Sequence, residues 1–267
     1  MAPIDVPSWT QLDMDAVCAR IRAVAFDLDN TLARSRKPML PWMAERFSTL
    51  TTLLPVAVIT GGRYGLVISQ ILDVLDAHAN RSHLHLMPTS GTRYYRWDGD
   101  DWRCVYAHDL GADLRDAAVA SLTDHAKELG LWLEDTWGPR IEDRGSQITF
   151  SALGQQAPVE IRERWDPDGT KRDALVRAVA ADLPELQVRA GGTTSVDISL
   201  RGYDKAFAIR ELASSLDLPV DRIMFVGDRM LPDGNDYPAA EAGSLAVCVT
   251  GPEDTARLCD ELIARLS

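Results

Sequence analysis

The sequence lacks long apolar runs and has fewer basic than acidic side chains. A membrane span needs roughly 18–20 consecutive apolar residues, and no segment of the chain approaches that length. The 267 residues include 28 Lys and Arg against 40 Asp and Glu, which gives a net charge of −12. Because so acidic a surface repels nucleic acid and anionic membranes, we expect neither as a partner.

Cysteine is scarce as well. The four cysteines (Cys18, Cys104, Cys248 and Cys259) are scattered, and none forms a CxxC pair. This spacing predicts reduced thiols rather than a disulfide framework or a zinc site. The first residues also lack the basic region and apolar run of a signal peptide. We therefore expect a cytoplasmic protein.

Short apolar runs that alternate with helical patterns are present at both ends of the chain. Four runs are typical of strands buried on both faces of a parallel sheet: residues 22–28, 55–60, 223–228 and 245–250. Apolar residues at helical spacing follow over 64–78, and a last amphipathic helix is expected over 253–266. This order predicts an α/β fold with a doubly wound, mostly parallel, Rossmann-like core.

The middle of the chain has a different pattern. Strict alternation of apolar and polar residues over 147–153 and 194–200 predicts antiparallel strands with one polar face, and helices are expected near 111–129 and 169–182. We therefore expect an α+β cap domain with an antiparallel sheet over 94–201. The core would be formed by 1–93 and 202–267, with 1–22 as an N-terminal extension.

The first acidic motif is Asp27-Leu28-Asp29-Asn30-Thr31, at the end of the first expected strand. Ligands of open α/β sheets bind beyond the carboxyl ends of the strands. Two carboxylates there repel each other unless a cation lies between them, so Mg²⁺ is a natural partner. One carboxylate can attack phosphorus while the other protonates the leaving oxygen. Taken alone, the motif fits better a strand-end turn whose acids cap the next helix.

Further polar residues follow the other expected strands. Asp228 ends another strand as a third oxygen ligand, and Asn235 and Asp236 follow a Pro/Gly loop, where they can support a metal site. Thr60, with Gly61 and Gly62, offers a hydroxyl and backbone N–H groups to a phosphate. Lys205 lies where the core resumes and can neutralise phosphate or the nucleophile. Together, these residues predict a phosphate-handling site at one edge of the sheet.

In order and spacing, these motifs resemble those of the haloacid dehalogenase superfamily of phosphotransferases. The resemblance implies that Asp27 is the nucleophile and Asp29 the general acid/base. It implies that Mg²⁺ is held by the Asp27 carboxylate, the Asp29 backbone carbonyl and Asp228. Thr60 and Lys205 would bind the transferring phosphoryl group. The inserted domain resembles the C2-type cap of the superfamily's IIB branch.

Longer segments resemble the eukaryotic-type α-phosphomannomutases, from about Ala23 to the end of the chain. They are residues 227–236, 249–257, 191–205 and 141–144. The resemblance implies that Arg144, Arg162, Ser195 and Asp197 of the cap, with Arg36 after the first motif, bind the sugar phosphate. It also implies a hexose 1,6-bisphosphate activator and a cap-mediated homodimer.

The chain departs from that family at four positions. Gln155 replaces a cap arginine, Leu28 and Asn30 replace the usual valine and glycine of the first motif, and Arg63 follows Gly62 where serine is usual. Losing one cap cation favours a sugar-phosphate phosphatase, whereas the whole-chain similarity favours a phosphomutase that interconverts hexose 1- and 6-phosphates. A catalytically silent sugar-phosphate-binding protein is the third alternative, and the intact set of acids is evidence against it.

Overall fold

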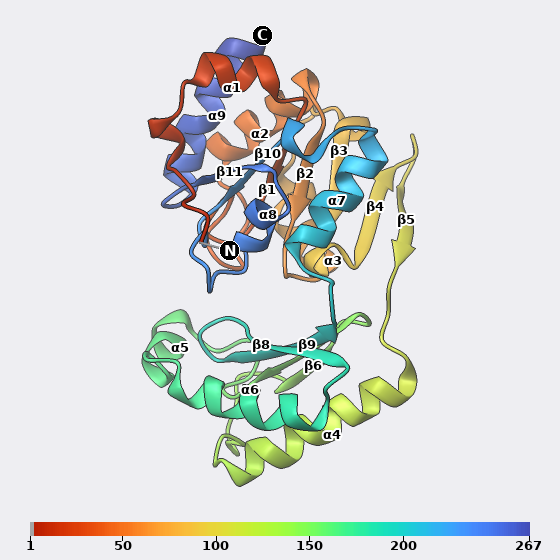
Figure 1. Cartoon of the computed structure of the whole chain (residues 1–267), viewed down its shortest axis with the longest axis vertical. Coiled ribbons are helices and arrows are strands. Elements are labelled where there is room, and N and C mark those ends of the chain that lie inside the picture. The colour runs from red at the N-terminus through yellow and green to blue at the C-terminus, as the bar shows by residue number, and fades with distance from the viewer. Residues whose placement is uncertain (1–2) are drawn as a thin grey trace. The chain divides into compact units, whose positions relative to one another are not determined.

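In the computed structural model, which describes residues 3–267, a seven-stranded sheet forms the centre of the first of two units. Its order is β11-β10-β1-β2-β3-β4-β5 (Figure 1). The strands from β11 to β3 are parallel, and β4 and β5 continue the sheet antiparallel. The strands are β1 (Ala23–Phe26), β2 (Val56–Ile59), β3 (Leu84–Met87), β4 (Arg93–Trp97), β5 (Trp102–Ala107), β10 (Ile223–Gly227) and β11 (Leu245–Cys248).

Helices cover both faces of this sheet, as the sequence predicts. Val24 and Phe26 of β1 pack into one apolar cluster, and Ala23 and Ala25 pack into another on the opposite face. Such a strand is buried on both sides. The first cluster includes residues of α1 (Met14–Arg20), α2 (Pro41–Leu53), α3 (Tyr64–Gln70) and α9 (Pro252–Leu266); the second includes residues of α7 (Lys205–Leu216) and α8 (Tyr237–Glu241).

The helix expected over 64–78 is shorter than predicted. α3 ends at Gln70, and a 3₁₀ turn over Leu72–Val74 follows it. The backbone carbonyl of Gln70 accepts a hydrogen bond from the N–H of Met39, at 2.9 Å. This carbonyl bonds to the segment that follows the first acidic motif instead of continuing the helix.

Residues 3–22 cover one edge of the sheet. Ser8 pairs with Cys248 of the edge strand β11, and the backbone N–H of Cys248 donates to the carbonyl of Pro7, at 2.9 Å. The indole Nε1 of Trp9 donates to Asp254 Oδ1 of α9, at 3.0 Å. Because an open strand edge can pair with other chains, this segment protects β11.

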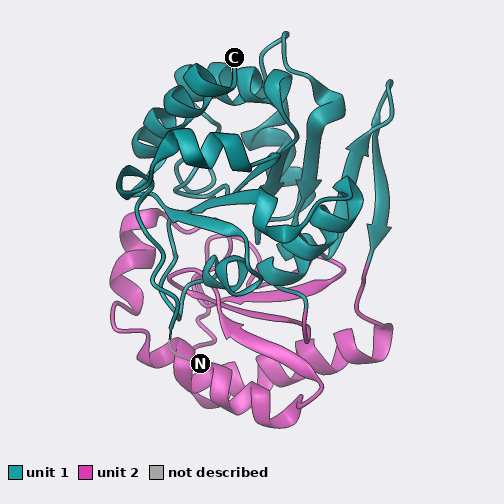
Figure 2. Cartoon of the chain, turned by 45° about the horizontal axis from the view of Figure 1, so that its top comes forward, with its two compact units in different colours: residues 1–107, 203–267 teal, residues 108–202 magenta. Residues whose placement is uncertain are grey.

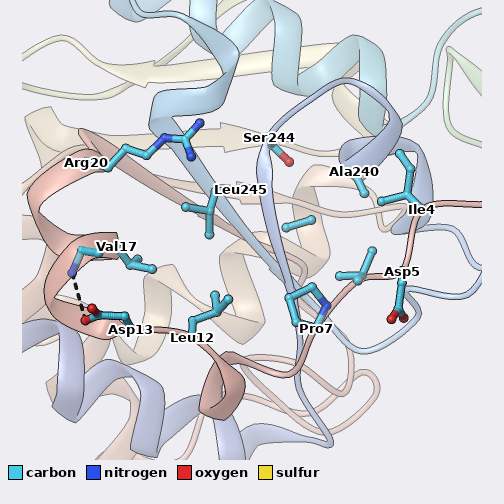
Figure 3. A pocket seen from close by; sticks show the side chains of 13 residues that line it. Ile4, Asp5, Pro7, Leu12, Asp13, Val17, Arg20, Ala240, Ser244 and Leu245 are labelled. Atoms are coloured by element: carbon cyan, nitrogen blue, oxygen red, sulfur yellow. Dashed lines mark hydrogen bonds between the residues drawn. The ribbon is translucent and has the colours of Figure 1, made fainter.

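A pocket of about 460 Å³ lies between the N-terminal segment and the edge strand β11 (Figure 3). Its walls are mainly apolar, from Leu12 and Val17 on one side to Leu245 on the other. Arg20 lines it too, but its guanidinium donates to Asp221 at 2.7 Å. No acid or lysine of the sequence-predicted active site is among the residues that line this pocket within 3–267.

The second unit, residues 108–202, has its own sheet and core (Figure 2). Its four antiparallel strands have the order β6-β7-β9-β8. Its elements are α4 (Ala112–Glu128), β6 (Ile141–Asp143), β7 (Gln147–Ser151), α5 (Val159–Trp165), α6 (Thr170–Asp182), β8 (Leu186–Ala190) and β9 (Ser195–Leu200). Apolar residues of α4 and α6 pack with Ile148, Phe150, Val196 and Ile198 of the sheet. This is the α+β unit with an antiparallel sheet that the alternating pattern predicts.

The boundary between the units differs from the one expected at 93/94. β4 and β5 pair with β3 in the core sheet, so the first unit extends to Ala107 and the second begins at His108. Alternation indicates an antiparallel pairing but does not indicate which sheet a hairpin joins. Across residues 3–267, no helix is both long and apolar enough to cross a membrane.

Candidate active site

Asp27 directly follows β1 and lies at the carboxyl edge of the parallel strands. Its backbone N–H donates to the carbonyl of Val226 in β10, at 2.9 Å, which fixes the end of β1 against its neighbour. Its side chain is buried, with 4% of the residue exposed. A carboxylate so placed has little freedom of orientation, as a nucleophile in an in-line attack requires.

Lys205 is the first residue of α7, and its ammonium lies between two acids. Asp204 caps the helix, because its carboxylate accepts hydrogen bonds from the N–H groups of Ala206 and Phe207. Lys205 is 1% exposed, and its Nζ donates to Asp27 Oδ1 and to Asp236 Oδ1. A buried ammonium is stable only when it is paired in this way.

Asp236 is fully buried beside Gly227, the last residue of β10. Its Oδ2 accepts a hydrogen bond from the N–H of Arg229, at 3.0 Å, while its Oδ1 accepts from Lys205. A Cβ added at Gly227 would lie 2.5 Å from Asp236 Oδ2. Glycine at 227 therefore lets the Asp236 carboxylate approach the end of β10.

The carboxylates of Asp27, Asp228 and Asp236 form one cluster, in which ligand oxygens from all three lie within 4.8 Å of one another. With all three carboxylates ionised, the single ammonium of Lys205 would leave an excess of two negative charges. Oxygen ligands in this number and proximity suit a hard divalent cation. The cluster is therefore compatible with a bound divalent metal.

Burial and neighbouring charges together shift the pKa values in this cluster. Burial raises the pKa of Asp27 to about 8. The positive charge of Lys205 acts to lower this pKa, and the negative charge of Asp236 acts to raise it. Burial, followed by the charge of Asp236, raises the pKa of Asp228 to about 6. Burial alone would lower the pKa of Lys205. The negative charges and hydrogen bonds of Asp236 and Asp27 outweigh burial, so the pKa is raised. Both acids therefore carry a penalty for ionisation that a cation would relieve.

Thr60 follows β2 at the same edge of the sheet and is 2% exposed. Its Oγ1 accepts a hydrogen bond from the N–H of Gly62, at 3.1 Å. The next segment supports this loop, because the N–H of Ser90 donates to the carbonyl of Thr60 and that of Thr89 donates to the carbonyl of Gly62, at 2.8 and 2.9 Å. Gly61 has no atom within 4 Å of the position of an added Cβ.

Asp29 lies two residues after Asp27, but its side chain is outside the carboxylate cluster. Its Oδ1 accepts hydrogen bonds from the backbone N–H of Arg36, at 2.8 Å, and from Nε2 of Gln70, at 3.1 Å. This placement suits the expectation that only the backbone carbonyl of Asp29 would bind metal. Asn235, expected to support the metal site, is exposed, in contrast to its neighbour Asp236.

The cap residues expected to bind substrate lie in the second unit. Ser195 and Asp197 lie on β9, and Asp197 Oδ1 accepts a hydrogen bond from Thr149 Oγ1 of β7, at 2.7 Å. The guanidinium of Arg144 donates through Nε and a terminal nitrogen to Glu142 Oε2, at 2.9 and 2.7 Å. Arg162 lies on α5, in a different element from the other three.

The close approach at Gly227 gives a prediction. Gly227→Ala should lower the free energy of unfolding by about 1–3 kcal/mol, because the new methyl group displaces the Asp236 carboxylate. Urea denaturation measures the loss. Gly65→Ala is the matched control, since its Cβ has only one neighbour, at 3.9 Å, on an exposed position of α3, and alanine favours the helix. Equal stability of the two variants would contradict the proposed packing.

A doubly wound core with an inserted α+β unit, and the acids and lysine gathered at its strand ends, define a phosphotransferase enzyme of the haloacid dehalogenase superfamily. The profile of the family described as "Eukaryotic phosphomannomutase" matches residues 48–265. The chain belongs to this family.

Individual proteins agree with this assignment. A phosphomannomutase of Spinacia oleracea is 27% identical over 244 residues, covering 89% of this chain and 94% of that protein. A probable phosphomannomutase of Caenorhabditis elegans is 26% identical over 254 residues, covering 91% and 96%. Among solved structures, a Plasmodium falciparum IMP-nucleotidase has a TM-score of 0.72 at 16% identity, covering 95% of this chain and 71% of that one. This last likeness shows a shared fold.

Gln70 is a residue of the site that no sequence motif predicts. Gln70 is buried at the end of α3 and contacts Asp29, 41 positions away in sequence. It occurs among the apolar residues of an amphipathic helix, where a buried glutamine has no distinctive spacing. Only the end of α3 and the fold of residues 36–39 bring it to the acid.

Proposed function

We propose that this protein is a phosphomutase that interconverts hexose 1- and 6-phosphates. The observation that carries the proposal is the buried Asp27 carboxylate, held by Lys205 at the carboxyl edge of the sheet beside two further acids. An oxygen of Asp27 attacks the phosphorus of a sugar phosphate, so that an Asp27–phosphorus bond forms and the bond from phosphorus to the sugar oxygen breaks. Asp29 donates a proton to that leaving oxygen.

The second half of the reaction returns the phosphoryl group to sugar. The free hydroxyl of a hexose monophosphate attacks phospho-Asp27 while Asp29 accepts its proton, which forms a hexose 1,6-bisphosphate and regenerates the Asp27 carboxylate. The bisphosphate turns over in the site, and Asp27 then attacks the phosphorus at its other end, which releases the isomeric monophosphate and restores phospho-Asp27. A hexose 1,6-bisphosphate is therefore the intermediate, and it also serves as the activator that phosphorylates an idle enzyme. Water must be excluded while phospho-Asp27 exists, because hydrolysis would otherwise waste it.

We propose Mg²⁺ as the cation of this site. The carboxylates of Asp27 and Asp228 and the backbone carbonyl of Asp29 would hold it, with Asn235 and Asp236 as supporting residues. When bound, Mg²⁺ neutralises charge on the phosphoryl oxygens and on the acids. Lys205 and Thr60, with the N–H groups of Gly61 and Gly62, bind the same phosphoryl oxygens.

Sugar-phosphate binding falls to other residues in this proposal. Arg144, Arg162, Ser195 and Asp197 of the second unit, with Arg36 of the first, would contact the sugar and its second phosphate. The pairing of Arg144 with Glu142 orients the guanidinium but also neutralises part of its charge. The homodimer formed through the cap remains a prediction, which light scattering of the purified protein tests.

The alternative function is a sugar-phosphate phosphatase, and the observation that favours it is Gln155. An amide at this position lacks the charge with which an arginine binds phosphate. In this alternative, Asp29 activates water to hydrolyse phospho-Asp27. The first half-reaction is identical, so the fate of the phosphoryl group separates the two functions.

The deciding experiment supplies mannose 1-phosphate, Mg²⁺ and a trace of hexose 1,6-bisphosphate. A mutase forms hexose 6-phosphate, needs the bisphosphate and releases little inorganic phosphate. Rapid release of inorganic phosphate that is indifferent to the bisphosphate would overturn the mutase in favour of the phosphatase. An enzyme-coupled assay for hexose 6-phosphate and a colorimetric assay for phosphate report both outcomes from one reaction.

The raised pKa of Asp27 predicts an unusual pH dependence of stability in the absence of metal. Its folded pKa of about 8 exceeds the unfolded value of about 4, so the folded state binds more protons between these pH values. Stability should therefore fall as the pH rises through this window. Excess Mg²⁺ should raise the melting temperature more at pH 8.5 than at pH 6, relative to EDTA. Melting curves that Mg²⁺ shifts equally at both pH values would contradict this prediction. In Asp27→Asn, the Mg²⁺-induced shifts at pH 8.5 and pH 6 should become nearly equal.

A further inference from the structure

The Asp29 carboxylate has two hydrogen-bond donors, and both bind the same oxygen. The backbone N–H of Arg36 donates to Oδ1 at 2.8 Å, and Nε2 of Gln70 donates to it at 3.1 Å. Arg36 presents its N–H from a left-handed backbone conformation, with φ at 58°. Within residues 3–267, both donors bind Oδ1 and neither binds Oδ2. Oδ1 is therefore the anchored oxygen, and Oδ2 remains for proton transfer.

Gln70 also holds the chain segment that follows the first motif. Its Nε2 donates to the carbonyl of Lys37 at 3.0 Å, and its own backbone carbonyl accepts from the N–H of Met39 at 2.9 Å. The two neighbours of Nε2 are both acceptors, so the amide cannot turn over without losing both bonds. Its orientation is thus fixed by the residues around it.

The other end of the amide is not satisfied. Gln70 is 1% exposed, and its Oε1 has no hydrogen-bond partner within residues 3–267. A buried acceptor without a partner lowers stability, and an apolar side chain of similar volume would avoid that loss. The amide is therefore poorly explained by packing alone. What it adds over an apolar residue is its donors to Asp29 and Lys37.

We infer that Gln70 is a positioning residue, which orients the Asp29 carboxylate for proton transfer to and from the sugar oxygen. This inference rests on the role of Asp29 in the proposed function. A general acid must lie within hydrogen-bond reach of the oxygen that it protonates, so small losses of position lower the rate. Arg36 alone would leave Asp29 one anchor, about which its carboxylate can rotate.

The test compares leaving groups in the first half-reaction. An alkyl oxygen needs a proton as it leaves phosphorus, whereas nitrophenolate leaves readily without one. Rapid-quench measurements should follow phosphorylation of the enzyme by glucose 1,6-bisphosphate and by p-nitrophenyl phosphate. We expect Gln70→Met to lower the rate about 10-fold with the bisphosphate and less than about 2-fold with the nitrophenyl ester. The KM for each of the two substrates should change little.

Val67→Ala is the matched control, because Val67 is a fully buried residue of the same helix that packs in the core. It tests whether a destabilised α3 alone lowers the rate. Gln70→Asn, which keeps the amide but withdraws it by one carbon, provides a second variant in case Gln70→Met folds poorly. It should show the same selective loss.

The outcomes separate this inference from the proposed function. Equal losses with both substrates, or a loss with the bisphosphate no larger than that of Val67→Ala, would overturn the role of Gln70. Asp29→Asn should itself show a large loss with the bisphosphate and a small one with the nitrophenyl ester. If Asp29→Asn leaves both rates unchanged, the acid/base role assigned to Asp29 fails. A selective loss in both variants supports both.

Discussion

Asp27→Asn is expected to lower turnover of a hexose phosphate by roughly four orders of magnitude or more, because an amide cannot act as the attacking nucleophile. The variant should also fail to become labelled when incubated with a phosphoryl donor. Mass spectrometry of the acid-quenched protein measures this directly. The parent should gain one phosphoryl group on the peptide that contains Asp27, and the variant should gain none.

The same variant should remain folded, which makes the loss interpretable. Burial raises the pKa of Asp27, so the ionised carboxylate is unfavourable there without a cation. Asparagine has nearly the same shape and no charge, and Lys205 keeps its partner Asp236. We expect a melting temperature in EDTA that is no lower than that of the parent at pH 8.5. Phosphorylation of Asp27→Asn at the parent's rate would refute the assignment of the nucleophile.

The strand-end residues were predictable from the sequence because parallel strands share one carboxyl edge. Asp27, Thr60 and Asp228 each follow a short apolar run, and β1, β2 and β10 are neighbours in the sheet. Runs of this kind identify buried strands, and the edge at which ligands bind follows from the parallel pairing. Lys205 was a candidate because it lies where the core resumes after the inserted domain, and the resemblance then implied its contact with the phosphoryl group.

Contacts that depend on loop geometry were not predictable. Asp236 was expected only as a supporting residue, yet it is buried and shares Lys205 with Asp27. Its position requires a residue without a side chain at 227, because a Cβ there would collide with the Asp236 carboxylate. This close approach arises only once the loop of residues 229–235 has folded. Gln70 was missed for a similar reason, because its contact with Asp29 depends on where α3 ends.

Lys205→Met is expected to lower the free energy of unfolding by about 3–5 kcal/mol, because it leaves the buried carboxylates of Asp27 and Asp236 without their cation. The loss should be larger at pH 8.5 than at pH 6. Without Lys205, Asp27 avoids part of the penalty at pH 6 by remaining protonated, because burial raises its pKa. At pH 8.5 it ionises and the full penalty returns. Urea denaturation in EDTA at the two pH values measures both effects.

A second substitution separates lost charge pairing from lost packing. Lys205→Met combined with Asp236→Asn removes one of the stranded carboxylates, so it should recover a substantial part of the stability lost in Lys205→Met. Asp236→Asn alone should be destabilising, since this carboxylate accepts from the N–H of Arg229 as well as from Lys205. The double variant would then be more stable than the sum of the single effects predicts. Additive losses would instead mean that the methylene stem of Lys205, and not its ammonium, stabilises the site.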